Sequence, residues 1–352
     1  MLEQRFEGFQ DDNQMKEMFL MMNYPYYLQT KSLSSLYDEV YRAKTPVIEN
    51  LLYSGTYLFV GAPKVGKSFF MAQLAYHIST GTDLWNYKVN QGTVLYLALE
   101  DDYARLQRRL YSMFGANGND NLYLATHSQQ LGDGLDKQLE FFISQHKDTK
   151  LIIIDTLQKI REVSGDKFSY ASDYDVVTRL KKFSDNNNIC MLLVHHTRKQ
   201  QADDSFETIS GTNGLLGAAD GAFVLHKEKR TNAKAFLDIV GRDQQDQRLH
   251  LEFNRERCLW EFIKAENELW NQPTDTLLES VSKIVNIESA EWSGTATELI
   301  TKLGLDISPN SLTRHLNVNA DRLFNEYQIA YENTRTHAGR QVTFKLISRE
   351  QE

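Results

Sequence analysis

One stretch of the chain has the residue types and the spacing of a phosphate-binding loop. Gly61-Ala62-Pro63-Lys64-Val65-Gly66-Lys67-Ser68 fits G-x-x-x-x-G-K-[ST] and stands between an apolar run and a helical pattern. The glycines let backbone N–H groups surround phosphate oxygens, and the N-terminus of the next helix favours an anion. In such a loop Lys67 contacts the β- and γ-phosphates, and the Ser68 hydroxyl is a Mg²⁺ ligand. The sequence therefore predicts a nucleotide site that extends from Gly61 to Phe69.

Two acidic residues stand where later apolar runs end. Leu151-Ile152-Ile153-Ile154 is followed by Asp155, and the run that starts at Thr93 is followed by Glu100. Functional side chains gather at the carboxyl ends of parallel strands. We therefore expect Asp155 to hold Mg²⁺ and Glu100 to orient the attacking water. Asp101 and Asp102 are alternatives to Glu100, although Asp102 fits better as the N-cap of the following helix.

A pair of histidines ends a further apolar run. Leu192-Leu193-Val194 is followed by His195 and His196. A polar side chain at the same edge of the sheet can hydrogen-bond the γ-phosphate and respond to its loss. His196 is the better candidate, because His195 is expected to point into the sheet.

The elements that must position these residues have the rhythm of an α/β fold. Apolar runs without polar alternation predict strands that are covered on both faces. These runs are Thr56–Val60, Thr93–Ala98, Leu151–Asp155, Ile189–His195 and Ala222–Leu225. Helical patterns lie between them, at Lys67–Thr80, Asp102–Phe114, Leu135–His146 and Asp173–Asn187. Three later runs with tight polar turns predict an antiparallel extension: Ala235–Val240, Arg248–Phe253 and Cys258–Phe262. The expected fold is α/β with a mixed, mostly parallel sheet.

Composition sets limits on the class of protein. The chain has 352 residues, of which 41% are hydrophobic and 24% charged, and these proportions are typical of globular proteins. No apolar run is long enough to span a membrane, and the N-terminus has no signal-peptide pattern, so we expect a cytoplasmic protein. The two cysteines exclude a disulfide scaffold. The net charge of −8 argues against broad nonspecific binding of nucleic acid, so any DNA contact must rest on a local site.

Four segments are expected along the chain. Residues 1–45 form an N-terminal segment with a helix at Gln14–Met22, residues 46–262 form the nucleotide-binding domain, and residues 263–275 form a polar linker. Residues 276–352 form a small C-terminal domain.

The expected elements of that C-terminal domain resemble a winged helix. Helices are expected at Thr276–Ile287, Thr295–Leu303 and from Ser308-Pro309 to Phe324, and strands at Gln328–Glu332 and Arg340–Ile347. Its basic residues are Arg314, His315 and Arg322 on the third helix and Arg335, His337, Arg340 and Lys345 on the wing. Eight basic and ten acidic residues give this domain a net charge of −2, so DNA contact and protein docking both stay open.

Taken together, these motifs resemble the RecA-like ATPases of the RepA type, the hexameric replicative helicases of plasmids and mobile elements. The resemblance runs from about Pro46 to Phe253 and is carried by GAPKVGKS, VLYLALEDD, LIIIDTLQKI, LLVHHTRK, SGTNGLLGAAD and VGRD. It implies ATP as the nucleotide, with Mg²⁺, hydrolysed at the subunit interfaces of a ring that is expected to be a hexamer. It also implies the roles given above for Glu100, Asp155 and His196.

The resemblance further implies single-stranded DNA in the centre of the ring, contacted by loops after the strands. The matching segments are Leu157–Tyr170 and Thr197–Ser210. Their basic residues are Lys159, Arg161, Lys167, Arg198 and Lys199. The alternative is that these are solvated surface loops.

A ring ATPase needs a cationic finger from the neighbouring subunit. In the RepA type this arginine follows a Gly- and Ser/Thr-rich segment, but the corresponding Gly217-Ala218-Ala219-Asp220 has none. Arg242 is the replacement candidate, because Gly241 before it permits a tight turn, and Arg230 is the second choice. A salt bridge from Arg242 to Asp243 or Asp246 is the purely structural alternative.

Three functions remain open at this stage. The first is an ATP-driven, ring-forming DNA helicase for the replication of a plasmid, phage or integrative mobile element, with replication initiators or other replication proteins as further partners. The second is a loader or regulatory ATPase that positions another replication protein through its C-terminal domain. The third is a DNA-binding regulator that uses ATP only as a structural ligand, and the full set of Lys67, Ser68, Glu100 and Asp155 argues against it.

Overall fold

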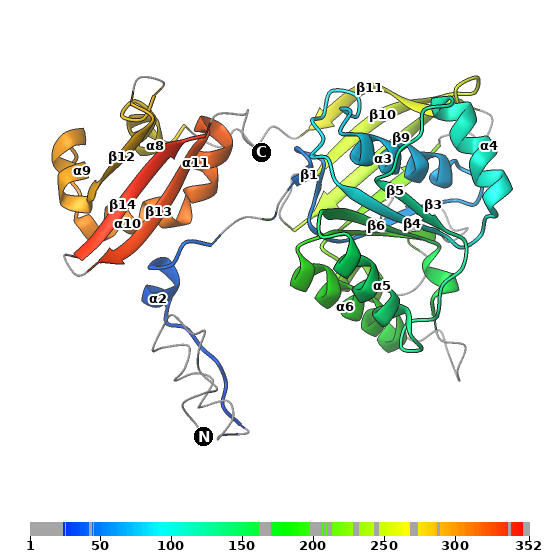
Figure 1. Cartoon of the computed structure of the whole chain (residues 1–352), viewed down its shortest axis with the longest axis horizontal. Helices are drawn as coiled ribbons and strands as arrows, with labels where there is room; N and C mark the ends of the chain where they lie inside the picture. The colour runs from blue at the N-terminus through cyan, green and yellow to red at the C-terminus, as the bar shows by residue number, and fades with distance from the viewer. Residues whose placement is uncertain are drawn as a thin grey trace. The chain divides into compact units, whose positions relative to one another are not determined.

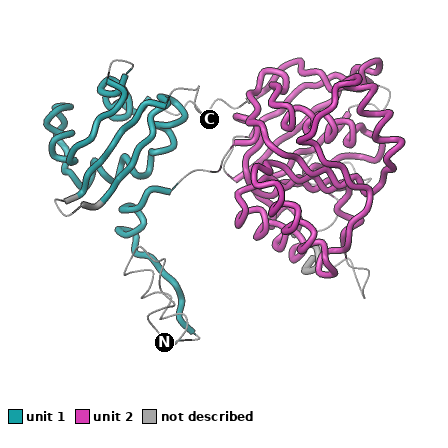
Figure 2. Tube along the Cα trace, in the orientation of Figure 1, with its two compact units in different colours: residues 1–43, 272–352 teal, residues 44–271 magenta. Residues whose placement is uncertain are grey.

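The chain forms two compact units, residues 44–271 and residues 1–43 together with 272–352 (Figure 2). The computed structural model describes residues 24, 26–41, 44, 46–161, 170–197, 206, 209, 213–227, 232–242, 246–267, 274–286, 289–336 and 339–347. The predicted helix Gln14–Met22 lies outside these residues. None of the helices in the described part of the chain has the length and the apolar character needed to cross a membrane.

The larger unit is built on a nine-stranded sheet in the order β11-β10-β9-β8-β3-β7-β6-β4-β5 (Figure 1). Its strands are β3 (Gly55–Gly61), β4 (Thr93–Ala98), β5 (Leu122–Ala125), β6 (Thr149–Asp155), β7 (Cys190–His196), β8 (Gly221–His226), β9 (Lys234–Gly241), β10 (Gln247–Asn254) and β11 (Leu259–Asn267). The strands from β5 to β8 in this order are parallel, and β9, β10 and β11 continue the sheet antiparallel. The predicted mixed sheet with an antiparallel extension is therefore confirmed.

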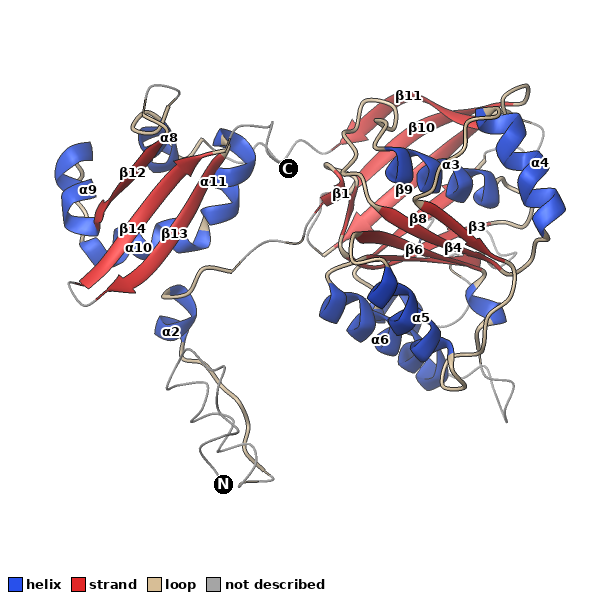
Figure 3. Cartoon of the chain, in the orientation of Figure 1, coloured by secondary structure: helices blue, strands red, loops and turns tan. Residues whose placement is uncertain are grey.

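Helices cover both faces of this sheet (Figure 3). Side chains of α3 (Lys67–Thr80) and α4 (Tyr103–Phe114) pack into one core, and those of α5 (Leu135–Gln145), α6 (Tyr170–Asn187) and α7 (Asn213–Ala218) into the other. Alternate residues of β3 serve the two cores: Tyr57 and Phe59 face α3, whereas Leu58 and Val60 face the other layer. Every residue of β3 is buried, which is why the strand has no polar alternation.

Some boundaries differ from the sequence predictions. Residues 263–267 were expected in the linker but continue β11, because they pair with β10 as far as Asn267. Strand β5 was missed because it is a short edge strand that is only partly buried. Helix α7 was also missed, and its six residues contain two glycines that weaken a helical pattern. A separate pair of short strands, β1 (Pro46–Ile48) and β2 (Leu52–Tyr53), precedes β3.

The smaller unit holds a three-stranded antiparallel sheet in the order β12-β14-β13. Its elements are α2 (Leu33–Tyr37), α8 (Thr276–Ser282), β12 (Glu291–Thr295), α9 (Ala296–Leu303), α10 (Pro309–Val318), α11 (Ala320–Tyr327), β13 (Ile329–Thr336) and β14 (Gly339–Leu346). Helix α10 begins as predicted, with the Ser308 hydroxyl accepting from Ser311 N and Pro309 in the first turn. The unit has an apolar core of its own.

Four expectations about this unit need correction. The single helix predicted to end at Phe324 is two helices that meet at Asn319. The first helix ends at Ser282 rather than Ile287, and β12 was not predicted. The two hairpin strands extend into the predicted connection, because their backbones pair from Ile329 to Thr336. In addition, α2 of the N-terminal segment packs on α10 within this unit.

Candidate nucleotide-binding site

The phosphate-binding loop, residues 61–68, joins β3 to α3 and needs both of its glycines. A Cβ on Gly61 would lie 2.6 Å from the carbonyl oxygen of Leu225. Gly66 has φ +112°, and a Cβ there would lie 2.8 Å from the ring of Trp260. The loop backbone is therefore packed against β8 on one side and β11 on the other, which fixes the start of α3 at Lys67.

Lys67 lies in the loop with its side chain buried. Its Nζ donates to Gly61 O at 2.8 Å and Ala62 O at 3.2 Å, and it lies 3.0 Å from His196 Nδ1. Burial lowers the pKa of Lys67 to about 8, although the nearby carboxylates of Asp155 and Glu100 oppose this shift. A bound polyphosphate would stabilise the charged form of this lysine.

Asp155 and Ser68 form the metal side of the site. Ser68 Oγ donates to Asp155 Oδ2 at 2.8 Å, and the hydroxyl of Tyr96 donates to the same oxygen at 3.0 Å. Asp155 is 5% exposed, and burial raises its pKa despite these two hydrogen bonds. One hydroxyl and one buried carboxylate fit Mg²⁺, which takes one or two protein carboxylates with water and substrate phosphates. The residues present therefore fit the predicted metal.

The structure separates Glu100 from its two acidic neighbours. Asp101 is bound by Arg109 at 2.6 Å and by Arg105 at 3.3 Å, so its charge is compensated. Asp102 Oδ1 accepts from the backbone N of Arg105 at 2.8 Å, which confirms the predicted N-cap. The side chain of Glu100 is exposed beside the site and accepts from the hydroxyl of Thr156 at 3.3 Å. Of these three acids, Glu100 is the one best placed to accept a proton from water.

The two histidines at the end of β7 differ in environment. His195 is 7% exposed, whereas His196 is partly exposed and faces Lys67. Burial, and next the charge of Lys67, lowers the pKa of His196, which favours a neutral ring beside the lysine. Gly61 pairs with His196, and Ala98 pairs with Asp155, so the strand register brings these ends to one edge of the sheet.

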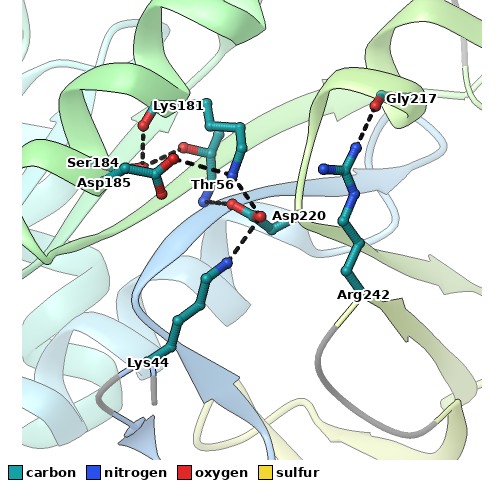
Figure 4. Close-up of polar contacts among 8 residues, drawn as sticks. All are labelled: Lys44, Thr56, Lys181, Ser184, Asp185, Gly217, Asp220 and Arg242. Atoms are coloured by element: carbon teal, nitrogen blue, oxygen red, sulfur yellow. Dashed lines mark hydrogen bonds and ion pairs between the residues drawn. The ribbon is translucent and has the colours of Figure 1, made fainter. Parts of the chain in front are cut away.

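Arg242 lies at the opposite edge of the sheet. Gly241 is paired with Gly221 at the start of β8, whereas the loop follows the far end of the neighbouring β3. Arg242 N donates to Asp220 O at 2.9 Å, and its guanidinium donates to Gly217 O at 2.8 Å (Figure 4). Arg242 thus lies beside the segment Gly217–Asp220 that lacks the expected arginine. Arg230 and Asp243 lie outside the described residues, and the predicted contact to Asp246 is replaced by Gly217 O.

The expected DNA-contacting loops are described only in part. Lys159 and Arg161 are described, whereas Lys167, Arg198 and Lys199 are not. The first of these segments does not begin as a flexible loop, because Leu157–Lys159 is a 3₁₀ turn whose Leu157 is fully buried together with Ile160. The structure places Lys159 in an exposed position at the end of that turn.

Three residues of the site were not found by sequence reasoning. Tyr96 and Thr156 bind the two carboxylates, and Trp260 Nε1 donates to Gly66 O at 3.2 Å. Tyr96 had no signal, because it lies inside an apolar strand. Trp260 lies on β11, far along the chain, so only the folded sheet brings it to the loop.

Comparison with known proteins supports this description. A family model described as an AAA domain matches residues 26–202. A solved structure of an isolated ATPase domain is similar, with a TM-score of 0.53 and 14% identity over 72% of this chain and 100% of that chain. Another, "The Structure Of A DnaB-Like Replicative Helicase And Its Interactions With Primase", gives 0.51 and 15% over 60% of this chain and 58% of that chain. These likenesses show that the larger unit has the RecA-like P-loop fold. No curated protein matches the chain.

Proposed function

The chain belongs to the AAA domain family of ATPases, and from this premise we propose that it is a ring-forming DNA helicase of the RepA type. In this proposal it serves the replication of a plasmid, phage or integrative mobile element in the cytoplasm. One observation carries the proposal: Lys67, Ser68, Glu100, Asp155 and His196 converge at the carboxyl edge of one sheet. The similar structure described as a DnaB-like replicative helicase supports the choice of a helicase.

Each residue has a defined part in ATP hydrolysis. Residues 61–69 would bind the phosphates through backbone N–H groups, while Lys67 would exchange its carbonyl partners for phosphate oxygens. Ser68 and Asp155 would hold Mg²⁺, which supplies charge neutralisation between the β- and γ-phosphates. Glu100 would take the proton of the attacking water, held in place by Thr156. His196 would pass from Lys67 to the γ-phosphate and so detect its loss.

Arg242 completes the site of the next subunit in this proposal. Its position at the edge opposite its own loop excludes direct action on its own nucleotide, because the length of β8 lies between them. A contact in trans within a hexameric ring would let its guanidinium leave Gly217 O for a neighbour's γ-phosphate.

Single-stranded DNA is the proposed substrate in the centre of the ring. The candidate contacts are Lys159, Arg161, Lys167, Arg198 and Lys199. The smaller unit is proposed to be a winged-helix domain, because its order of helices and strands follows α8-β12-α9-α10 and then a β13-β14 hairpin.

A strand-displacement assay tests this function directly. The wild-type chain with ATP and Mg²⁺ should unwind a forked DNA substrate, and Lys67→Ala should abolish both ATP turnover and unwinding. Lys64→Ala is the matched control, because it removes an exposed lysine from the same loop. ATP turnover without displacement of either polarity would contradict the helicase and favour the loader, which would then need a protein partner for the C-terminal domain.

A further inference from the structure

The N-terminal segment lies on the helix of the smaller unit that occupies the recognition position. We use "strap" for residues 26–41, which include α2. Helix α2 contacts α10, and Val40 packs against the apolar core of this unit (Figure 1). Asn317 on α10 donates its side-chain N–H to Tyr37 O at 2.9 Å. The strap therefore covers the face of α10 that includes Asn317.

One carboxylate of the strap faces two arginines. Asp38 Oδ2 accepts from Arg340 Nη2 at 2.8 Å, and Asp38 Oδ1 lies 3.6 Å from Arg314 Nε. The second distance is too long for a hydrogen bond, and Arg314 Nε is shielded from water without a hydrogen-bond partner among the described residues. A single negative charge thus serves two positive charges that come from α10 and β14, and the pair keeps an excess of positive charge.

The contacts have a uniform chemical sense. Arg314, Arg340 and the amide of Asn317 offer N–H donors, and the strap offers only acceptors, the Asp38 carboxylate and the Tyr37 carbonyl. A phosphodiester backbone is also an anion with acceptor oxygens only, and arginine guanidinium groups fit its geometry. The strap therefore presents to this surface the same chemistry that a nucleic-acid backbone would present.

The strap is held weakly by apolar contacts. None of the residues of α2 is buried, and Leu33 and Leu36 remain 64% and 42% exposed. Segments with few buried apolar contacts open at a low cost in free energy. A ligand that satisfied both arginines could therefore displace the strap.

We propose that Arg314, Arg340 and Asn317 form a binding surface for a nucleic-acid backbone, which the strap covers with Asp38 until DNA displaces it. The smaller unit then binds DNA through this local site in spite of its net negative charge. Only the substrate class, DNA, rests on the proposed helicase function. A competing occupant, an acidic peptide, is distinguished by the test.

Fluorescence anisotropy with labelled single- and double-stranded DNA tests the surface in the full chain. Asp38→Asn should tighten DNA binding by roughly 5-fold or more, the ordinary range for coupling between sites. The slope of log affinity against log salt should steepen by about one to two, because two arginines gain phosphates. Glu39→Gln is the matched control, because it removes the neighbouring charge whose partner, Lys31, lies on the strap itself. It should leave both quantities unchanged.

Two further arms keep the proposal falsifiable. Arg314→Gln with Arg340→Gln should cancel the gain of Asp38→Asn, and persistence of the gain would overturn the surface. Hydrogen exchange of the wild-type chain needs no variant: saturating DNA should speed exchange in residues 26–41, and unchanged exchange would overturn displacement. Competition by polyglutamate without any DNA effect would identify an acidic peptide as the occupant and overturn the proposal.

Failure of the motor is kept separate from failure of the strap. All binding measurements are repeated in the Lys67→Ala background without ATP, where turnover is absent by design. A gain from Asp38→Asn there supports the strap even if the wild-type chain unwinds nothing.

Discussion

Two buried aspartates at opposite edges of one sheet have opposite environments. Asp155 at the carboxyl edge is 5% exposed and Asp220 at the amino edge is 4% exposed. Burial raises the pKa of Asp155, which receives hydrogen bonds only from the hydroxyls of Ser68 and Tyr96 among the described residues. Burial also acts to raise the pKa of Asp220, but its hydrogen bonds hold the pKa below its usual range.

The partners of Asp220 explain this difference. It accepts from Lys181 at 2.6 Å, Lys44 at 2.9 Å and the backbone N of Thr56 at 2.9 Å (Figure 4). A buried carboxylate with two lysines is a compensated structural group, whereas one without a cation is ready to bind one. The amino edge is therefore assembled by the chain itself, and the carboxyl edge is completed by its ligand.

The largest effect is expected where the amino edge would stop being only structural. Arg242→Ala should lower ATP turnover by roughly 10³-fold or more with nucleotide binding intact, because a finger acts on the transition state. Steady-state turnover and fluorescent-nucleotide binding measure the two properties. Arg248→Ala, which removes an arginine paired with Asp238 on the same extension, should change turnover only slightly.

Mixing variants tests whether Arg242 acts in trans. Subunits with Arg242→Ala and subunits with Lys67→Ala should together recover turnover that neither has alone, because some interfaces then combine both intact groups. Near-normal turnover by Arg242→Ala alone would remove it from the site and leave Arg230 as the candidate.

Removing the compensated carboxylate should cost stability rather than nucleotide binding. Asp220→Asn should lower the free energy of unfolding by about 3 kcal/mol, because two lysines lose their buried partner. Denaturant titration measures this change. Asp136→Asn is the control, since its pair with Arg179 is exposed and should contribute less than about 1 kcal/mol.

The pH dependence of this difference has a defined sign. The folded-state pKa of Asp220 is lowered, so its stabilisation is complete above the unfolded pKa of about 4 and is lost as the pH falls through the folded pKa. The gap between the wild-type chain and Asp220→Asn should therefore be constant near neutral pH and close in acid. A gap that widens as the pH falls would show that Asp220 is not held ionised.

A change at the carboxyl edge should leave the fold intact. Glu100→Gln should lower ATP hydrolysis by about 100-fold, the usual scale for a general base, without weakening ATP binding. Asp101→Asn is the informative partner, because Asp101 is bound by Arg109 and should matter less for hydrolysis. If Asp101→Asn is the inactive variant, the base is misassigned by one residue.

The smallest effect is expected when both edges are kept and the other unit is removed. Residues 44–271 retain Lys44 for Asp220 and form a compact unit. Their ATP turnover should stay within a few-fold of the full chain, measured in solution after size-exclusion chromatography. Aggregation of this fragment would contradict an independent core.

Local signals were enough to predict much of the larger unit. The glycine pattern, the acids at strand ends and the cap at Asp102 depend on residues close together in the chain, and helix α3 has the predicted bounds. Uniform burial of β3 matches its uninterrupted apolar run. The break between α10 and α11 and the edge strand β5 were missed, because they depend on packing rather than on pattern.

The sequence by itself determined the phosphate-binding loop and the order of strands that carry Glu100, Asp155 and His196. Only the tertiary structure decided which acid is compensated: Asp101 by Arg109, Asp220 by Lys44 and Lys181. It also placed the strap on α10. The physical reason is that a motif is set by covalent neighbours, whereas the charge state and the partner of a side chain depend on distances across the fold, and these fall within ion-pair range only once the sheet and its helices have packed.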